Sequence, residues 1–179
     1  AGAFRREELV ALRVEDLEGV PPMPATPRAP ASPGGLRVHV RRSKTDQEGS
    51  GAVVPVLRGS ADGGRYCPVV AVREWLAAAG IVDGPVFRAL WKGGRRARGT
   101  PLRPGAVAAI VKIHAARIGH DPAAFAGHSL RAGFLTSAAG RGATLWKMRE
   151  VSRHRSVDVL AGYVRDAEAF VGHAGEGLL

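Results

Sequence analysis

The stretch GHSLRAGFLTSAAGRG, residues 127 to 142, places a histidine and an arginine three positions apart at the start of an apolar segment. Gly140 is a typical helix stop, so we predict a helix that ends there. Residues three apart lie on one face of a helix, which would let His128 and Arg131 contact one ligand together. Arginine grips two oxygens and histidine carries a proton near neutral pH. The pair therefore suits a phosphate, although the spacing also fits an ordinary surface pair.

Further helices are predicted on both sides of this stretch. Residues 67–80 and 104–119 each carry a proline near the start and end in a glycine, the usual punctuation of a helix. Residues 144–151 and 156–166 are expected to form two short helices with Thr144 and Ser156 as N-caps. Residues 5–13, RREELVALR, have leucines on one side and charges on the other, which predicts a short amphipathic helix.

Strands are predicted mainly in the N-terminal third. Apolar and basic residues alternate in LRVHVRR, residues 36–42, which predicts a half-buried strand with a basic face. Residues 52–57 are expected to pair with it, with Lys44 at or near the hairpin tip, and residues 84–91 to add a short strand. Prolines in residues 20–35 predict an exposed loop. We therefore expect one domain over residues 1–179, mainly α with a small antiparallel sheet, an α+β fold.

Charge is the strongest compositional signal. The chain has 26 Lys and Arg against 16 Asp and Glu, a net charge of +10, which favours a polyanionic partner such as nucleic acid. No acid interrupts the basic stretch from Arg88 to Arg103. It is either a solvated loop or a contact for the DNA backbone. The residues expected to make backbone contacts are Arg41, Arg42, Arg88, Lys92, Arg95, Arg96 and Arg98.

Several classes of protein fit the sequence poorly. Cys67 is the single cysteine, so neither an internal disulfide nor a thiolate zinc cluster can form. No H-E-x-x-H motif or carboxylate cluster is present, so we expect no metal site and no cofactor. No run approaches the roughly 18 apolar residues of a membrane span. A cytoplasmic protein without a membrane partner is expected.

Two residues near the C-terminus also have the chemistry for phosphate. Tyr163 follows His154 by nine positions in RHRSVDVLAGYVRD, residues 153–166. A phenol is a poor nucleophile unless nearby cations stabilise the phenolate, and arginines surround this segment. A tyrosine that fills a groove on an amphipathic helix and a histidine bonded to backbone are the alternative interpretations.

Four short motifs, here called boxes, follow one another along the chain: RREEL, RRSKTD, GHSLRAGF and RHRSVDVLAGYVRD. Together they resemble the signature motifs of the tyrosine recombinases, the phage integrase family. The resemblance implies that Tyr163 attacks a DNA phosphodiester, forming a 3′-phosphotyrosyl link. Arg5 and Arg131 would hold the non-bridging oxygens, His154 would donate a further hydrogen bond, and His128 would help manage the tyrosine's proton.

The remaining implications concern support, partners and origin. Lys44 would protonate the leaving 5′ oxygen and Glu8 would support the site, with neither metal nor ATP. The expected partner is double-stranded DNA, bound by a homotetramer on two duplexes when the protein is full-length. The resemblance implies a nucleoid-associated protein of bacterial or mobile-element origin.

The chain also departs from the family pattern. It begins almost on the first box, so the family's N-terminal DNA-binding domain and the start of its catalytic domain are expected to be absent. Residues 20–35 are an inserted loop relative to the family. Arg153 stands where a glycine commonly precedes the second histidine. A type IB topoisomerase and an inactive DNA-binding remnant stay as alternative functions.

Overall fold

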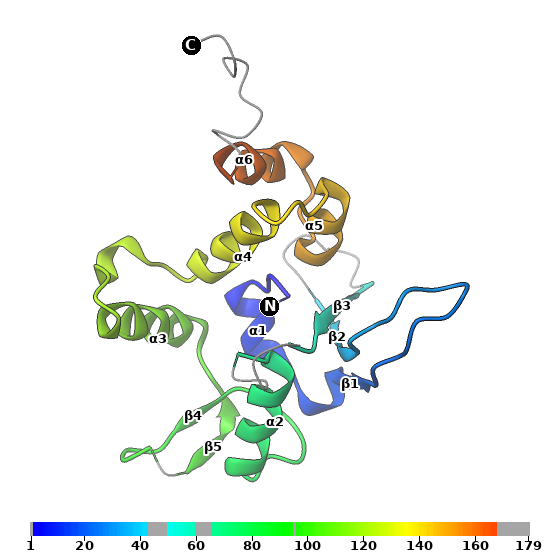
Figure 1. The fold of residues 1–179 in the computed structure, drawn as a ribbon. Coiled ribbons are helices and arrows are strands. Elements are labelled where there is room, and N and C mark those ends of the chain that lie inside the picture. Colours follow the sequence, from blue (N-terminus) through cyan, green and yellow to red (C-terminus); the bar gives the residue numbers. More distant parts are fainter. Residues whose placement is uncertain (1, 43–49, 60–65, 95, 168–179) are drawn as a thin grey trace.

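The computed structural model describes residues 2–42, 50–59, 66–94 and 96–167 (Figure 1). Within them the helices are α1 (Arg6–Ala11), α2 (Pro68–Ala78), α3 (Pro104–Arg117), α4 (Ser129–Ala139), α5 (Leu145–Ser152) and α6 (Val157–Ala167). The strands are β1 (Leu17–Val20), β2 (Gly35–Val40), β3 (Ala52–Leu57), β4 (Arg88–Leu90) and β5 (Ala97–Pro101). The expected α+β class, mainly helical with small antiparallel sheets, is confirmed.

The larger sheet has the antiparallel order β1-β2-β3. Val38 pairs with Leu17 on one side and with Val54 on the other, so the predicted alternation gives one buried face. Pro55 is tolerated because β3 is an edge strand of this sheet. The expected strands in residues 36–42 and 52–57 are confirmed, whereas β1 was not predicted, since four residues with a glycine among them carry too little alternation.

The proline-rich residues 20–35 form the exposed loop that their composition predicts, and Figure 1 shows it projecting from the sheet. Val20 pairs with Gly35 at its base, and isolated bridges join Met23 to Ser32 and Thr26 to Ala29. Gly34 has φ +66°, and a Cβ there would lie 2.5 Å from the Val20 carbonyl oxygen. The loop is therefore a long, narrow extension of the β1–β2 hairpin.

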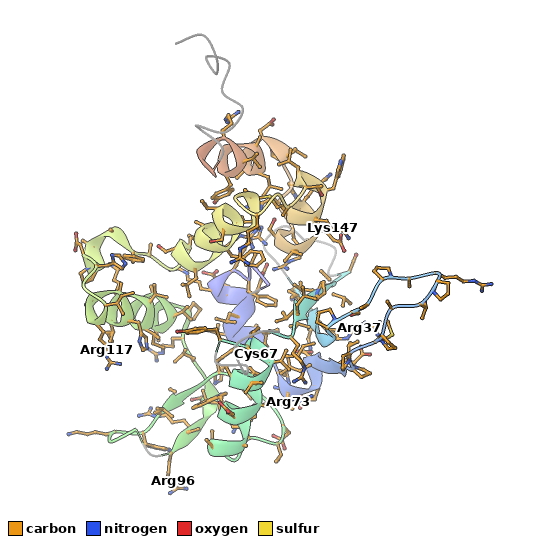
Figure 2. The ribbon with its side chains drawn as sticks, viewed as in Figure 1. Arg37, Cys67, Arg73, Arg96, Arg117 and Lys147 are labelled. Atoms are coloured by element: carbon orange, nitrogen blue, oxygen red, sulfur yellow. The ribbon has the colours of Figure 1, made fainter. Side chains whose placement is uncertain are left out.

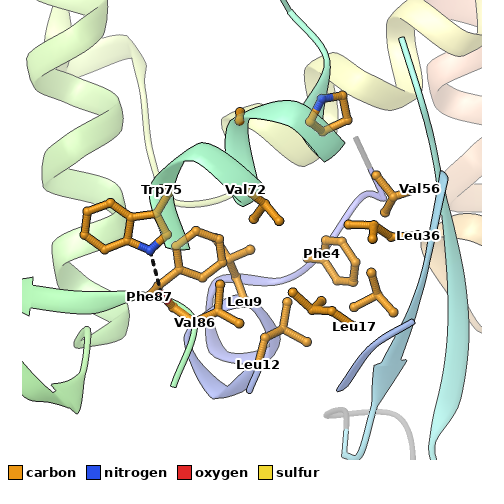
Figure 3. A pocket seen from close by; sticks show the side chains of 13 residues that line it. Phe4, Leu9, Leu12, Leu17, Leu36, Val56, Val72, Trp75, Val86 and Phe87 are labelled. Atoms are coloured by element: carbon orange, nitrogen blue, oxygen red, sulfur yellow. Dashed lines mark hydrogen bonds between the residues drawn. The ribbon is translucent and has the colours of Figure 1, made fainter. Parts of the chain in front are cut away.

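An apolar core lies between α1, the sheet and α2 (Figure 3). Its buried members are Leu12, Val38, Val56 and Val86. Partly buried side chains such as Phe4 and Trp75 pack against them and line a cavity of about 280 Å³. The Trp75 indole donates a 2.7 Å hydrogen bond to the Val86 carbonyl, which fixes α2 to the segment before β4.

A second core joins the last three helices, which lie together at one end of the molecule in Figure 1. Leu135 and Ala139 from α4 meet Met148 from α5 and Leu160 from α6. The predicted caps are confirmed: the Thr144 hydroxyl accepts from Lys147 N–H at 3.3 Å, and the Ser156 hydroxyl accepts from Asp158 N–H at 3.0 Å. The first core therefore holds α1, and the second core holds the turn between α5 and α6.

The basic stretch around residue 90 forms a second hairpin, β4–β5, in which Arg88 pairs with Pro101 and Leu90 with Ala97. The short strand expected in residues 84–91 is confirmed. Strand β5 was not predicted because ARGTP is mostly exposed and lacks alternation. Across the described residues, each helix is too short or too polar to cross a membrane.

Candidate active site

The first predicted site residue, Arg5, stands immediately before α1 and is joined to Glu8. Its guanidinium Nη1 donates to Glu8 Oε1 at 2.7 Å, and its backbone N–H donates to Glu8 Oε2 at 2.9 Å. Glu8 is only 3% exposed, so this is no solvated surface pair. Burial raises the pKa of Glu8, but the hydrogen bonds from Arg5 and the nearby Arg153 charge outweigh burial and lower it overall. A fixed carboxylate therefore orients Arg5.

Arg131 on α4 is 7% exposed and ties three segments together. Its Nη1 donates to the Ala3 carbonyl and its Nη2 to the Ser152 carbonyl at the end of α5. Burial, with the charge of Arg5, lowers its pKa to about 10, so the guanidinium stays charged at neutral pH. Two of its five N–H donors serve these carbonyls, which leaves others for a ligand.

His154 lies just after α5, with its ring against Arg131. Arg131 Nη2 is 3.3 Å from both ring nitrogens, and the Ser152 hydroxyl is 2.7 Å from Nδ1. Burial lowers the pKa of His154 to about 4, helped by the charges of Arg131, Arg5 and Arg153. The ring is therefore neutral at pH 7, and a Ser152 hydroxyl that donates to Nδ1 leaves the proton on Nε2.

Tyr163 on α6 is half-buried and faces this cluster. Its ring centroid lies 6.5 Å from that of His154, with the planes tilted by 50°. It also packs against the core of Leu135 and Leu160. Burial lowers the pKa of Arg131, and Tyr163 is near enough to oppose that shift weakly. The Tyr163 ring therefore packs against the core of the last helices, and the same ring also lies beside the cluster of predicted site residues.

Two further predicted catalytic residues are His128 and Lys44. His128 is the N-cap residue of α4 and is exposed, whereas Arg131 is buried in the same helix. A shared ligand for His128 and Arg131 therefore stays a prediction. Lys44 and Arg95 lie outside the described residues.

One residue of the cluster was missed as a site residue. Arg153 contacts Glu8 through its guanidinium, and its carbonyl accepts from Arg5 Nη2 at 3.5 Å. The sequence offered one signal for this residue: Arg153 precedes the second histidine, at a position where the family commonly has glycine. Arg5 and Arg153 share the Glu8 carboxylate, and Arg131 lies against the neutral ring of His154, so three guanidinium charges stand near one carboxylate charge. This excess of positive charge suits an anion.

Comparison with known proteins finds one relative that the chain resembles. No protein-family model matches the chain. It is 35% identical over 174 residues, 97% of its length, to an integrase/recombinase XerD homolog of Selenomonas ruminantium. Over nearly its whole length the chain is therefore similar to part of a recombinase, which supports the tyrosine recombinase resemblance of its motifs. It spans about half, 47%, of the length of that relative.

The basic residues that are expected to contact DNA differ in how many contacts they make within the protein. Arg88 donates to the Pro85 and Asp83 carbonyls at the base of the β4–β5 hairpin. Arg41 pairs with the buried Asp16 at 2.7 Å, although its side chain stays 57% exposed. Arg42, Lys92, Arg96 and Arg98 are exposed. Arg98 also lies over the Trp91 ring at 4.5 Å.

Because the pKa of His154 is depressed, the stability of the protein should depend on pH. The folded-state pKa of about 4 lies below the ordinary value of 6.5. As pH falls below 6.5, the unfolded chain therefore binds a proton that the folded chain resists. We expect the free energy of unfolding to fall between pH 6.5 and pH 4, and to be unaffected by this group above pH 6.5.

Urea unfolding at about pH 7, 6 and 5 measures this effect. His154→Asn removes the titrating ring and should flatten that part of the pH dependence. Glu8, whose pKa is lowered from 4.5, contributes stability that is lost only at more acidic pH. Equal slopes in the wild-type and His154→Asn chains would contradict the depressed pKa.

Proposed function

We propose that this chain is the catalytic domain of a site-specific DNA recombinase that breaks and rejoins DNA through Tyr163. One observation carries the proposal. Arg5 at the start of α1, Arg131 on α4 and His154 after α5 converge beside Tyr163 on α6. These are the residues that the family resemblance assigns to a scissile phosphate.

The cleavage step uses each residue in a separate role. Arg5 and Arg131 neutralise the non-bridging oxygens, whose charge grows in the transition state. His154 donates from Nε2 to the same phosphate. Tyr163 Oη then bonds to phosphorus while the bond from phosphorus to the 5′ oxygen breaks, giving a 3′-phosphotyrosyl link.

Two proton transfers balance this step. His128 accepts the phenol proton of Tyr163, and Lys44 donates a proton to the 5′ oxygen, which leaves as a hydroxyl. The phosphotyrosyl link conserves the energy of the phosphodiester. A 5′-hydroxyl from a second strand can therefore reverse the step without ATP, and the side chains provide the positive charge that a metal would otherwise supply.

The whole protein would extend beyond this chemistry. We propose that residues 1–179 form the catalytic domain, that residues 20–35 are an insertion within it, and that the complete protein acts on two DNA duplexes as a homotetramer. The net charge of +10 supports DNA as the partner. The exposed basic hairpin β4–β5 supports a contact with the phosphate backbone, and Figure 2 shows Arg96 pointing away from the body of the protein.

The hairpin contact predicts a salt-dependent effect. Lys92→Gln with Arg96→Gln should weaken binding to duplex DNA several-fold and reduce the slope of log affinity against log salt by up to about 2, since each lost phosphate contact removes about 0.9. Lys112→Gln with Arg117→Gln on α3 is the charge-matched control. Filter binding at several salt concentrations measures both pairs, and equal losses would argue against a hairpin-specific contact.

The test of the function is covalent capture. The protein is incubated with a pool of nicked duplexes of randomised sequence, and DNA that stays attached after denaturation in detergent is recovered and sequenced. Recovery of a preferred sequence supports the recombinase. Adducts without sequence preference, together with relaxation of any supercoiled plasmid, would favour the topoisomerase. Binding without any adduct would leave a DNA-binding remnant.

A further inference from the structure

Arg153 adopts a backbone conformation that normally belongs to glycine. It is the C-cap residue of α5 with φ 57° and ψ 39°, in the left-handed region. A side chain is strained there, whereas glycine is not, which explains why helices so often end on glycine at this kind of turn. A strained arginine at this turn needs side-chain contacts that offset the strain.

The Arg153 side chain makes such contacts. It is 11% exposed and pairs with Glu8 Oε2. Its Nη1 donates to the Val151 carbonyl at 2.9 Å, and its guanidinium lies 5.5 Å from the centre of the Phe4 ring. The turn before His154 is thereby fastened to α1, on which Glu8 lies.

The contacts of Glu8 show what Arg153 does for Arg5. A guanidinium facing a single carboxylate tends to form a two-pronged pair that uses both oxygens and two of its nitrogens. Here Arg5 reaches Glu8 through one side-chain nitrogen only, Nη1 to Oε1. Arg153 and the Arg5 backbone N–H share Oε2. Arg5 Nη2 is left with a long 3.5 Å contact to the Arg153 carbonyl.

We propose that Arg153 is a positioning residue: by occupying Oε2 of Glu8, it prevents Arg5 from closing a two-pronged pair and keeps Arg5 Nη2 available for an anion. The inference rests on the proposed function only in taking that anion to be phosphate. Arg153 thus does more than replace the glycine of this turn. Arg153 and Arg5 share the buried Glu8 carboxylate, and Arg5 thereby keeps Nη2 for the substrate.

The test is a double-mutant cycle with inorganic phosphate as the ligand. Phosphate binding to each variant is measured from the NMR chemical shifts of the His154 ring. Arg153→Gly should weaken phosphate binding on the order of ten-fold, because Arg5 then closes on Glu8. In a Glu8→Gln background the competing carboxylate is gone, so the same Arg153→Gly change should have less than about a three-fold effect. Arg153→Lys, which still places a cation on Glu8, should restore most of the binding.

Arg141→Gly removes an arginine from an exposed turn and is the control for net charge. Amide spectra report whether each variant folds. If Glu8→Gln does not fold, Arg153→Gln decides the matter, because its neutral amide can still donate to Glu8 Oε2 and should keep more binding than Arg153→Gly, whereas a simple cation role would make the two losses equal. An equal loss of phosphate binding in both backgrounds would overturn the proposal, because Arg153 would then act as a simple cation. If Arg153→Gly causes no loss of binding at all, the proposal is also overturned. If wild-type protein gives no response to phosphate, the proposed phosphate site fails, and this inference with it.

Discussion

Tyr163→Phe is expected to abolish the covalent adduct between this chain and nicked DNA. The phenol oxygen is the proposed nucleophile, and no other atom of the ring can bond to phosphorus. Loss of a covalent nucleophile removes a rate enhancement of many orders of magnitude, so the adduct should fall below detection in a denaturing gel. The measurement uses a duplex recovered from the covalent-capture pool.

The fold should survive the loss of this hydroxyl. The ring stays in place against Leu135 and Leu160, so the free energy of unfolding should change by no more than about 1 kcal/mol. Tyr66→Phe is a matched control, because Tyr66 is the chain's other tyrosine and is 79% exposed. An adduct that persists in Tyr163→Phe would mean that another residue attacks the DNA, and the assignment would be wrong.

Arg131→Lys should impair both catalysis and stability. Arg131 bridges the Ala3 and Ser152 carbonyls, and a lysine has no planar fork to serve both while also facing a phosphate. Removing a phosphate-clamping arginine lowers phosphoryl transfer on the order of 10³-fold or more. One buried carbonyl left without a donor should lower the free energy of unfolding by about 1–3 kcal/mol.

The two effects are measured separately, by the initial rate of adduct formation and by urea unfolding. Arg141→Lys, in the exposed turn just after α4, is the control and should change neither. A variant that loses stability but forms the adduct at the wild-type rate would reduce Arg131 to a structural residue. If the variant keeps both the wild-type rate and the wild-type stability, Arg131 is not needed as a bridge between α4 and α5 either.

Much of the fold follows from local signals. Proline at the start and glycine at the end predict α2 and α3, and hydroxyl caps at Thr144 and Ser156 predict α5 and α6. Strands β1 and β5 were missed because their pairing is decided by the neighbouring strand rather than by their own alternation. Register and partner choice in such short, exposed strands come from tertiary context.

The site shows a similar division. The resemblance names Arg5, Arg131, His154 and Tyr163, but nothing in the spacing of residues 5 and 131 says that they meet. The burial of Glu8 and the shared use of its oxygens are equally invisible in RREEL. Arg153 was noted as a departure from the family pattern, yet its left-handed backbone and its pairing with Glu8 appear only in the folded chain.

In the proposed mechanism Arg5, Arg131 and His154 bind one phosphate beside Tyr163. A crystal structure of the chain grown with inorganic phosphate or sulfate tests it most directly. We expect a single anion within hydrogen-bonding distance of both guanidinium groups and His154 Nε2, with Tyr163 Oη facing it. Separate anions on separate surfaces, or none at this cluster in crystals that hold the anion elsewhere, would contradict it.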